Sequence, residues 1–519
     1  MVGLTLNRAY NSLNLCNFWL EVIIIATMKL KLIVIATLLV ANGLPVMAES
    51  SLTGNPYSKS THFDTSLPDL GDVSQTVFTP LDEQRIGEQI MREVSVSDEV
   101  VQDVEVIDYL NALGNKLAAA STDKQQKFNF FVVNDTSINA FAMPGGVIGV
   151  HTGLFLAANS ESELASVLGH EIGHVTQRHL ARMVASQKND TIKNIAGFAL
   201  ALLVARANPE LASGAMTTAS AVGVQNQLDY TREHEREADR VGLQIISNAG
   251  FDVRGMPAFF KTLQHGSRFS EGGAPSFLRT HPLTGERIAD VANRVEQMPY
   301  RQVPDSAEFQ YVKAKLQAQN GAVETNIAVF EQNIRERRTA NEAVEHYGLA
   351  VAYLRKNSLT QAEKEVAWLK KNAPQNAMIE NLSARLQVAK NNAPLAGQQY
   401  AAALKIYPDN RALLYGYADH FLALKQADSA IQLVKEKQRL YPKDAQFYEV
   451  LAKAYSIQNK MLLSHQAQGE AYFRKYDLKR AIEQMELAVR AKDGDFYQHS
   501  IVEARLKELQ RMQGEDKKG

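Results

Sequence analysis

Cysteine is nearly absent from this sequence: the 519 residues include one, Cys16. A lone cysteine excludes an intramolecular disulfide framework and a cysteine-ligated structural zinc site. An excess of one charge is also lacking, because 56 Lys and Arg residues balance 57 Asp and Glu residues. Nothing in this balance favours nucleic acid or a strongly anionic membrane as a partner. With 45% hydrophobic and 22% charged residues, the composition is that of a globular protein, long enough for two or three domains.

An apolar run near the N-terminus has the features of an export signal. Met28 and two lysines that follow it closely precede the stretch LIVIATLLV, and small residues close the segment at Ala48. We therefore expect residues 1–48 to be a signal peptide with an upstream extension, cleaved near Ala48, and Met28 to be the true start. The alternative is a membrane anchor over residues 22–41, which the lysines interrupt. Cleavage would leave an exported, cysteine-free chain, which suits the bacterial periplasm.

The middle of the chain predicts a mainly helical α+β domain over residues 81–303. It follows an exposed lead-in segment, residues 49–80, that is rich in Ser, Thr, Pro and Gly and has no hydrophobic period. The elements that we expect are amphipathic helices over 81–94 and 104–120, strand-like segments over 128–133 and 145–153, and further helix from 160 to 250.

The last 200 residues repeat with a period of 34, since Pro374, Pro408 and Pro442 each follow an apolar-periodic helix. Two series of alanines, here called ladders, have the same spacing of 34 residues. The first is Ala350, Ala384, Ala418 and Ala452. The second is Ala328, Ala362, Ala396 and Ala430, which stands twelve residues after the first within the repeat. This is the tetratricopeptide pattern, which predicts a curved α-helical solenoid over residues 304–511, followed by a charged tail, 512–519. The alternative is a nonrepeating helical bundle.

Near the C-terminus the repeat changes phase. Gly469, Tyr472, Ala481 and Ala488 form another repeat-like set, but Gly469 follows Ala452 by 17 residues, half a period. We therefore expect one helix in this region to serve two helix pairs.

The stretch SVLGHEIGHVTQRHL carries the pattern H-E-x-x-H at His170, Glu171 and His174. Ser160 and Glu163 predict a capping box at the start of this helix. His170 and His174 lie one turn apart on one helix face, where both can ligate one ion at about 2.0–2.1 Å. Glu171 is then near enough to take a proton from water at the metal. Apolar spacing predicts a buried stripe made of Leu164, Val167, Leu168, Ile172 and Val175.

A catalytic zinc ion usually has three protein ligands and an open position, so a third ligand must come from another element. The helix predicted in TREHEREADRVGLQIISNAG places Glu235, Asp239 and Gly242 on one face. We expect Glu235 to complete a site for one Zn²⁺ ion, and Asp239 to hold a ligand histidine by its second ring nitrogen.

The alternative for this helix is a solvated acidic face paired with its own arginines, but the upstream histidines favour the metal site. We expect His179 and His234 to lie at the surface.

The motifs HEIGH and EREAD, with NAFAMPGGVIGVHTGL upstream and RTHPLTGERI downstream, resemble the gluzincin peptidase family that includes HtpX and the prenyl-protein endopeptidases. The resemblance extends over residues 75–510 and implies a zincin-type metalloprotease fold. It implies that His170, His174 and Glu235 are zinc ligands, that Glu171 is the general base, and that Asp239 is the acid often described as proton donor.

The resemblance also gives His281, within RTHPLTGERI, as a histidine that approaches the metal and keeps the enzyme latent; the alternative is a structural loop residue beside Pro282. In the family, a strand before the metal-binding helix pairs with substrate by its edge. This suggests residues 145–150 here, with Gly145, Gly146, Val147 and Ile148 as candidates. The alternative is a buried strand with both edges occupied.

Together with the export signal and the repeats, the chain resembles the branch of this family that acts in the assembly of outer-membrane β-barrel proteins. The resemblance implies a cell-envelope zinc endopeptidase that cleaves misfolded or stalled polypeptides. It implies that the repeats bind these clients or the outer-membrane assembly machinery. The alternative function is a chaperone or adaptor with a latent or structural metal site.

The chain departs from the membrane-integral members of the family. Its apolar stretch over residues 194–205 is 12 residues long, too short to span hydrocarbon. We expect a core helix or a lid over the metal, with a patch that contacts a client or the membrane periphery as the alternative. A membrane-integral peptidase would require residues 194–226 to insert.

Overall fold

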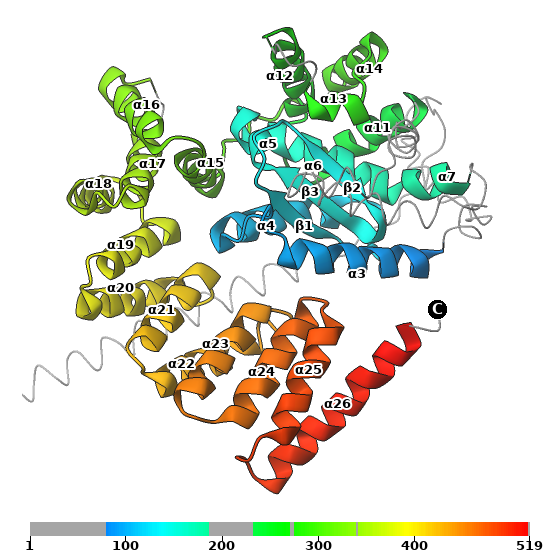
Figure 1. Ribbon diagram of the computed structural model, residues 1–519. Helices are drawn as coiled ribbons and strands as arrows, with labels where there is room; N and C mark the ends of the chain where they lie inside the picture. The colour runs from blue at the N-terminus through cyan, green and yellow to red at the C-terminus, as the bar shows by residue number, and fades with distance from the viewer. Residues whose placement is uncertain (1–78, 186–231, 270–274, 339–340, 517–519) are drawn as a thin grey trace, which may run out of the picture. The chain divides into compact units, whose positions relative to one another are not determined.

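The computed structural model describes residues 79–185, 232–269, 275–338 and 341–516. Its described residues include a three-stranded sheet with the order β1-β3-β2 (Figure 1). The strands are β1 (Asn129–Val133), β2 (Ala140–Met143) and β3 (Val147–His151), and β3 pairs parallel with β1 and antiparallel with β2. β2 lies between the two expected strand-like segments, 128–133 and 145–153, where the sequence pattern predicts no strand.

The sheet is buried on both faces. Phe130 and Val132 of β1 join the core that includes residues of α4 (Val104–Ala120) and α6 (Glu161–Thr176). Phe131 and Val133 join a second core beneath α3 (Pro80–Val96). Successive side chains of a strand point to opposite faces, so a strand covered on both sides needs a continuous apolar run.

Helices α3 and α4 confirm the two helices expected before the sheet. The apolar stretch 194–205, the predicted signal peptide and the lead-in segment up to residue 78 lie outside the described residues. The other elements of this region are η1 (Pro144–Gly146), α5 (Thr152–Ala157), α7 (His179–Ala185), α11 (Arg232–Asn248), α12 (Gly255–Phe269), α13 (Ser276–Thr280) and α14 (Gly285–Glu296).

Helical hairpins follow, as the 34-residue period predicts (Figure 1). Their helices are α15 (Ala307–Gln319), α16 (Val323–Glu336), α17 (Glu342–Arg355), α18 (Leu359–Asn372), α19 (Ala377–Ala389), α20 (Ala393–Ile406), α21 (Arg411–Ala423), α22 (Ala427–Gln438), α23 (Ala445–Ile457), α24 (Met461–Arg474), α25 (Leu478–Arg490) and α26 (Phe496–Asp516). None of the helices in the described ranges is long and apolar enough to cross a bilayer.

The alanine ladders mark where paired helices touch. Every alanine of the first ladder is buried, as are Ala362, Ala396 and Ala430 of the second. Ala328 is exposed, and Ile327 and Phe330 fill the core on α16 instead. α16 begins two residues earlier in the repeat than α18 does.

The change of phase has the expected result at α24, which packs against both α23 and α25. Gly469 permits the second contact, because a Cβ there would lie 3.0 Å from Met485 Cε and 3.2 Å from the carbonyl oxygen of Ala481.

Ion pairs join α4 and the residue before it to the repeats. Lys315 of α15 is 1% exposed and its Nζ lies 2.5 Å from Asp103 Oδ2, with Glu105 also in contact. Arg411 of α21 pairs with Asp108 at 2.5 Å. Because one continuous core cluster contains residues of α4 to α6 and of α15 to α19, the expected domain boundary at residue 303 stays a prediction.

Candidate metal centre

Helix α6 runs through the middle of the core, and this position buries its polar residues. Ser160 caps the helix by accepting from the N–H of Glu163, but the Glu163 carboxylate accepts from the N–H of Asn159 instead of completing the predicted capping box. The expected apolar stripe covers one face of the helix, but every residue from Glu161 to His174 is buried, so this part of the helix is buried on all sides. His170, Glu171 and His174 are 3%, 0% and 2% exposed.

Helix α11 crosses α6 at close range and carries Glu235 and Asp239, each 1% exposed, toward it. Glycines make the close approach: a Cβ on Gly242 would lie 3.0 Å from the backbone nitrogen of His170, and one on Gly173 would lie 3.0 Å from the carbonyl oxygen of Ala238. The solvated acidic face considered for this helix is therefore wrong for Glu235 and Asp239. Arg236 and Arg240 instead approach acidic residues of α14.

His170, His174, Glu235 and His281 converge, with one ligand atom of each within 4.8 Å of the others. The Nε2 atoms of His170 and His174 lie 3.0 Å apart, and Glu235 Oε1 lies 3.3 Å from Nε2 of His174. His281 follows α13 and is 1% exposed, with Nδ1 2.9 Å from Glu235 Oε1. Two imidazoles and a carboxylate, with a third imidazole beside them, can hold one divalent metal ion.

The carboxylate of Glu171 lies beside this cluster and is fully buried. Both of its carboxylate oxygens are buried without a hydrogen-bond partner among the described residues. Burial raises the pKa of Glu171 above its usual value. His281 is the cationic group beside it, with Nε2 3.6 Å from Oε1, too far for a hydrogen bond, so the arrangement fits a polar ligand or ion at the cluster.

The pKa values of Glu235 and His281, which lie near Glu171, are shifted in opposite directions. Burial alone would raise the pKa of Glu235, but His281 and His174 outweigh it and hold that pKa well below its usual range. Burial alone would lower the pKa of His281, but Glu235 and Glu171 outweigh it and raise the pKa. His281 and Glu235 therefore form a buried ion pair. His281 Nε2 also lies 3.6 Å from Glu171 Oε1.

Asp239 lies behind the cluster and has two partners. Its Oδ1 lies 2.9 Å from Nδ1 of His170, as expected from the sequence. Its two oxygens accept from Nε and Nη2 of Arg287 at 2.7 and 2.8 Å. Nη1 of Arg287 lies 2.6 Å from Glu235 Oε2 and donates to the carbonyl oxygen of Pro282 at 2.9 Å. Arg287, 2% exposed, thus ties Glu235 and Asp239 to the segment of His281.

Sequence reasoning missed Arg287, although it lies within the motif RTHPLTGERI that was matched to the family. The surface position expected for His179 is wrong. His179 is 0% exposed, and its Nδ1 lies 2.9 Å from Nδ1 of His174. Burial lowers its pKa to about 4. His234 is half-buried and its ring stacks on that of His179. No pattern signalled these contacts, because α7 follows a turn at Arg178, whose φ is +52°.

The expectation that residues 145–150 offer a strand edge to substrate is wrong. Val147 and Ile148 belong to β3, the central strand, whose two edges are paired with β1 and β2. Gly145 and Gly146 form the turn η1 before it, with φ values of 74° and 72°. In the described sheet β1 and β2 are the edge strands, and the end of β1 is bridged at Val133 to Val100, whereas β2 pairs with β3 alone and presents an open edge.

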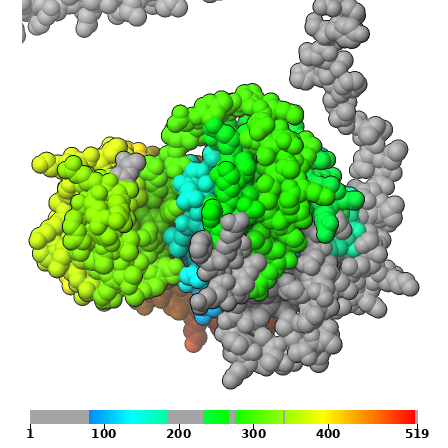
Figure 2. All heavy atoms as spheres, turned by 90° about the horizontal axis from the view of Figure 1, so that it is seen from above, coloured from blue at the N-terminus to red at the C-terminus, as the bar shows by residue number. Residues whose placement is uncertain are grey.

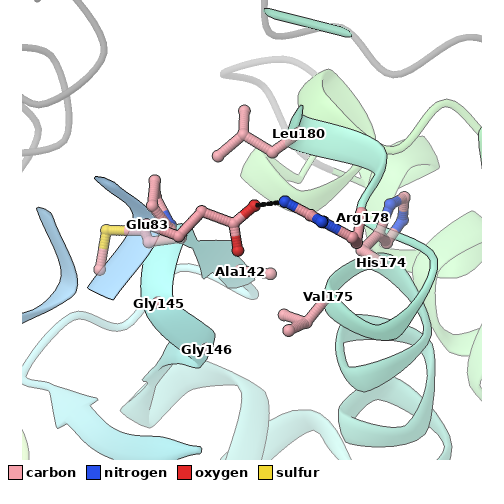
Figure 3. Close-up of a pocket in the computed structure, with 10 residues that line it drawn as sticks. Glu83, Ala142, Gly145, Gly146, His174, Val175, Arg178 and Leu180 are labelled. Atoms are coloured by element: carbon pink, nitrogen blue, oxygen red, sulfur yellow. Dashed lines mark hydrogen bonds and ion pairs between the residues drawn. The ribbon is translucent and has the colours of Figure 1, made fainter. Parts of the chain in front are cut away.

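A hollow of about 330 Å³, counted with the solvent at its mouth, lies beside this edge (Figure 3). Met143, Gly145 and Gly146 line it from the turn, and His174 and Val175 line it from α6. An ion pair of 3.0 Å between Glu83 and Arg178 spans it from α3. In the space-filling view, residues of the chain that include α12 to α14, drawn in green, form much of the face that is seen from above (Figure 2).

Comparison with known proteins gives two family matches: peptidase family M48 over residues 107–295 and the tetratricopeptide repeat over residues 381–455. A putative beta-barrel assembly-enhancing protease of Vibrio cholerae is 32% identical over 419 residues, 80% of this chain and 86% of that protein. The beta-barrel assembly-enhancing protease of Escherichia coli K12 is 30% identical over 454 residues, 86% of this chain and 92% of that protein.

The mitochondrial metalloendopeptidase OMA1 of Arabidopsis thaliana is 32% identical over 225 residues, 42% of this chain and 43% of that protein. The long matches cover both the metal centre and the repeats. The chain is therefore a metalloendopeptidase with a tetratricopeptide region, and it belongs to peptidase family M48, in the branch of the beta-barrel assembly-enhancing proteases.

Proposed function

We propose that this protein is a zinc-dependent endopeptidase of the bacterial periplasm that cleaves misfolded or stalled outer-membrane β-barrel proteins and assists their assembly. The convergence of His170, His174 and Glu235 beside the fully buried Glu171 carries the enzymatic part of this proposal. The names of the Vibrio and Escherichia relatives support the client class. The export signal read from the sequence supports the location.

In this proposal His170, His174 and Glu235 hold the zinc ion. Zinc, when bound, lowers the pKa of its water to about 7 and polarises the scissile carbonyl. Glu171 accepts a proton from the attacking water and passes it to the leaving amine nitrogen. Asp239 accepts the Nδ1 hydrogen of His170, which leaves the Nε2 lone pair of that ring directed at the metal.

Substrate is proposed to bind in extended form along the open edge of β2, whose residues 140–143 precede the hollow beside His174. Backbone hydrogen bonds to an edge strand do not depend on side chains, which suits an enzyme that acts on unfolded clients of varied sequence. The helical repeats are proposed to bind the clients or the outer-membrane assembly machinery.

His281 favours a second candidate, a chaperone or adaptor with a structural or latent metal site. With His281, four protein side chains surround the metal position, and structural zinc sites have four protein ligands whereas catalytic ones keep a position open.

Within the enzyme proposal, we propose that His281 holds the enzyme latent and moves away when a client binds. His281→Ala should then raise cleavage of a generic substrate.

The decisive experiment compares wild type with Glu171→Gln on an unfolded outer-membrane protein and on casein. Glu171→Gln should keep zinc and fold, and cleavage should fall about 10²- to 10⁴-fold, the usual contribution of a general base. Glu286→Gln, an exposed glutamate on α14, is the matched control and should cleave normally. Equal cleavage by Glu171→Gln and wild type would remove Glu171 from the mechanism. Client assembly that survives loss of cleavage would favour the adaptor.

A further inference from the structure

The two histidines proposed as ligands have different groups behind them. Nδ1 of His170 lies 2.9 Å from a carboxylate oxygen of Asp239. Nδ1 of His174 instead lies 2.9 Å from Nδ1 of His179. Two ring nitrogens at this distance share one hydrogen, so one of them donates and the other accepts. Which ring donates decides whether His174 can bind a metal.

Metal binding fixes the direction of this hydrogen bond. Nε2 of His174 faces the cluster, 3.0 Å from Nε2 of His170, so a metal takes the lone pair of that nitrogen. His174 must then carry its hydrogen on Nδ1, and Nδ1 of His179 must accept it. The hydrogen of His179 is left on Nε2, which lies 3.0 Å from Glu237 Oε2.

We propose that His179 and Glu237 are positioning residues for the ligand His174. The Glu237 carboxylate accepts the Nε2 hydrogen of His179, which fixes the ring so that its Nδ1 accepts from His174. This hydrogen-bonded chain selects the one tautomer of His174 that offers Nε2 to a metal. The inference rests on the proposed metal site, and it adds two residues that do not touch the metal.

The surroundings hold the chain of hydrogen bonds in place. The ring of His179 stacks on that of His234, with centroids 4.4 Å apart and an interplanar angle of 17°. Arg182 Nη1 donates to the same Glu237 oxygen at 3.0 Å. Helix α11 thus carries a proposed ligand, Glu235, and also the carboxylates behind both ligand histidines: Asp239 in direct contact with His170, and Glu237 through His179.

The test measures zinc affinity of the purified full chain by competition with a chelator. His179→Phe keeps a ring of similar size but removes the acceptor, and it should weaken zinc binding about 10- to 100-fold, the usual effect of losing an outer partner of a ligand. His179→Asn, whose amide oxygen can accept near the position of Nδ1, should recover most of the affinity. Glu233→Gln, an exposed change on the same helix, should have no effect.

Nitrogen NMR of histidine-labelled, zinc-loaded wild type gives a readout that needs no variant. His179 should carry its hydrogen on Nε2 and His174 on Nδ1. A hydrogen on Nδ1 of His179, or unchanged zinc affinity in a folded His179→Phe protein, would overturn the inference. If His179→Phe does not fold, the ring assignment decides alone. Failure of wild type to bind zinc would instead refute the proposed metal site.

Discussion

The crossing of α6 and α11 provides a prediction in which helix propensity and packing disagree. Gly242→Ala replaces a glycine inside a helix, which by propensity alone should stabilise the protein by about 1 kcal/mol. The new Cβ would lie 3.0 Å from the backbone nitrogen of His170 and 3.1 Å from the carbonyl carbon of Gly169. Neither atom can rotate away, because both belong to the backbone of the facing helix.

The size of the effect follows from these distances. Ordinary contacts of a Cβ begin at 3.4 Å, so the helices must separate by a few tenths of an ångström at the crossing. Glu235 lies on one of these helices and His170 and His174 on the other. Metal–ligand distances tolerate changes of about 0.2 Å, and a misplacement of about 1 Å can cost about 10²-fold in rate.

A shift of this size lies between these two limits, so we expect Gly242→Ala to lose roughly 10-fold in zinc affinity and in peptidase activity. The free energy of unfolding of the metal-free protein should fall by about 1–3 kcal/mol. Chelator competition, cleavage of unfolded protein and urea unfolding measure these quantities. Gly514→Ala in α26 is the matched control, because its Cβ would meet nothing within 4 Å. A Gly242→Ala protein that is more stable and binds zinc as wild type does would refute the packing argument.

Two further predictions concern buried charges. Arg287→Met removes the guanidinium that contacts two buried carboxylates, so the free energy of unfolding of the metal-free protein should fall by about 3–5 kcal/mol in urea titration. Zinc should restore part of this loss, whereas the half-exposed control Arg294→Met should change little. Burial lowers the pKa of His151 to about 4, so the unfolded chain binds a proton before the native protein does as pH falls below about 6.5. The stability that neutral His151 contributes, about 3 kcal/mol, should be lost as pH falls from 7 to 4. The difference in the free energy of unfolding between wild type and His151→Gln should therefore shrink over that range. A difference that stays constant with pH would contradict the assignment.

Local geometry explains what the sequence predicted well. His170 and His174 share a helix face because the spacing of four matches one helical turn, wherever the helix lies. The same holds for Glu235 and Asp239 on α11. The period of 34 residues predicted the helical hairpins, because each hairpin buries its small residues against its neighbours in the same way.

Contacts between distant segments decided what the sequence left open. β2 pairs with β3, which makes β3 a central strand and removes the substrate edge expected at residues 145–150. A strand that is apolar throughout shows burial on both faces, but it does not show which strands lie beside it. Ala328 keeps the repeat period and still lies at the surface, because Ile327 and Phe330 are the residues of α16 that pack into the core.

The environment of the metal centre likewise depended on tertiary structure. The residues HEIGH and EREAD determined by themselves which side chains could ligate a metal, since helical spacing fixes their relative directions. Only packing decided that His179 is buried behind His174, that Arg287 joins Glu235 to Asp239, and that His281 stands beside His170, His174 and Glu235. Burial and the partners of a charge arise from segments that lie far apart in sequence, and no local pattern encodes them.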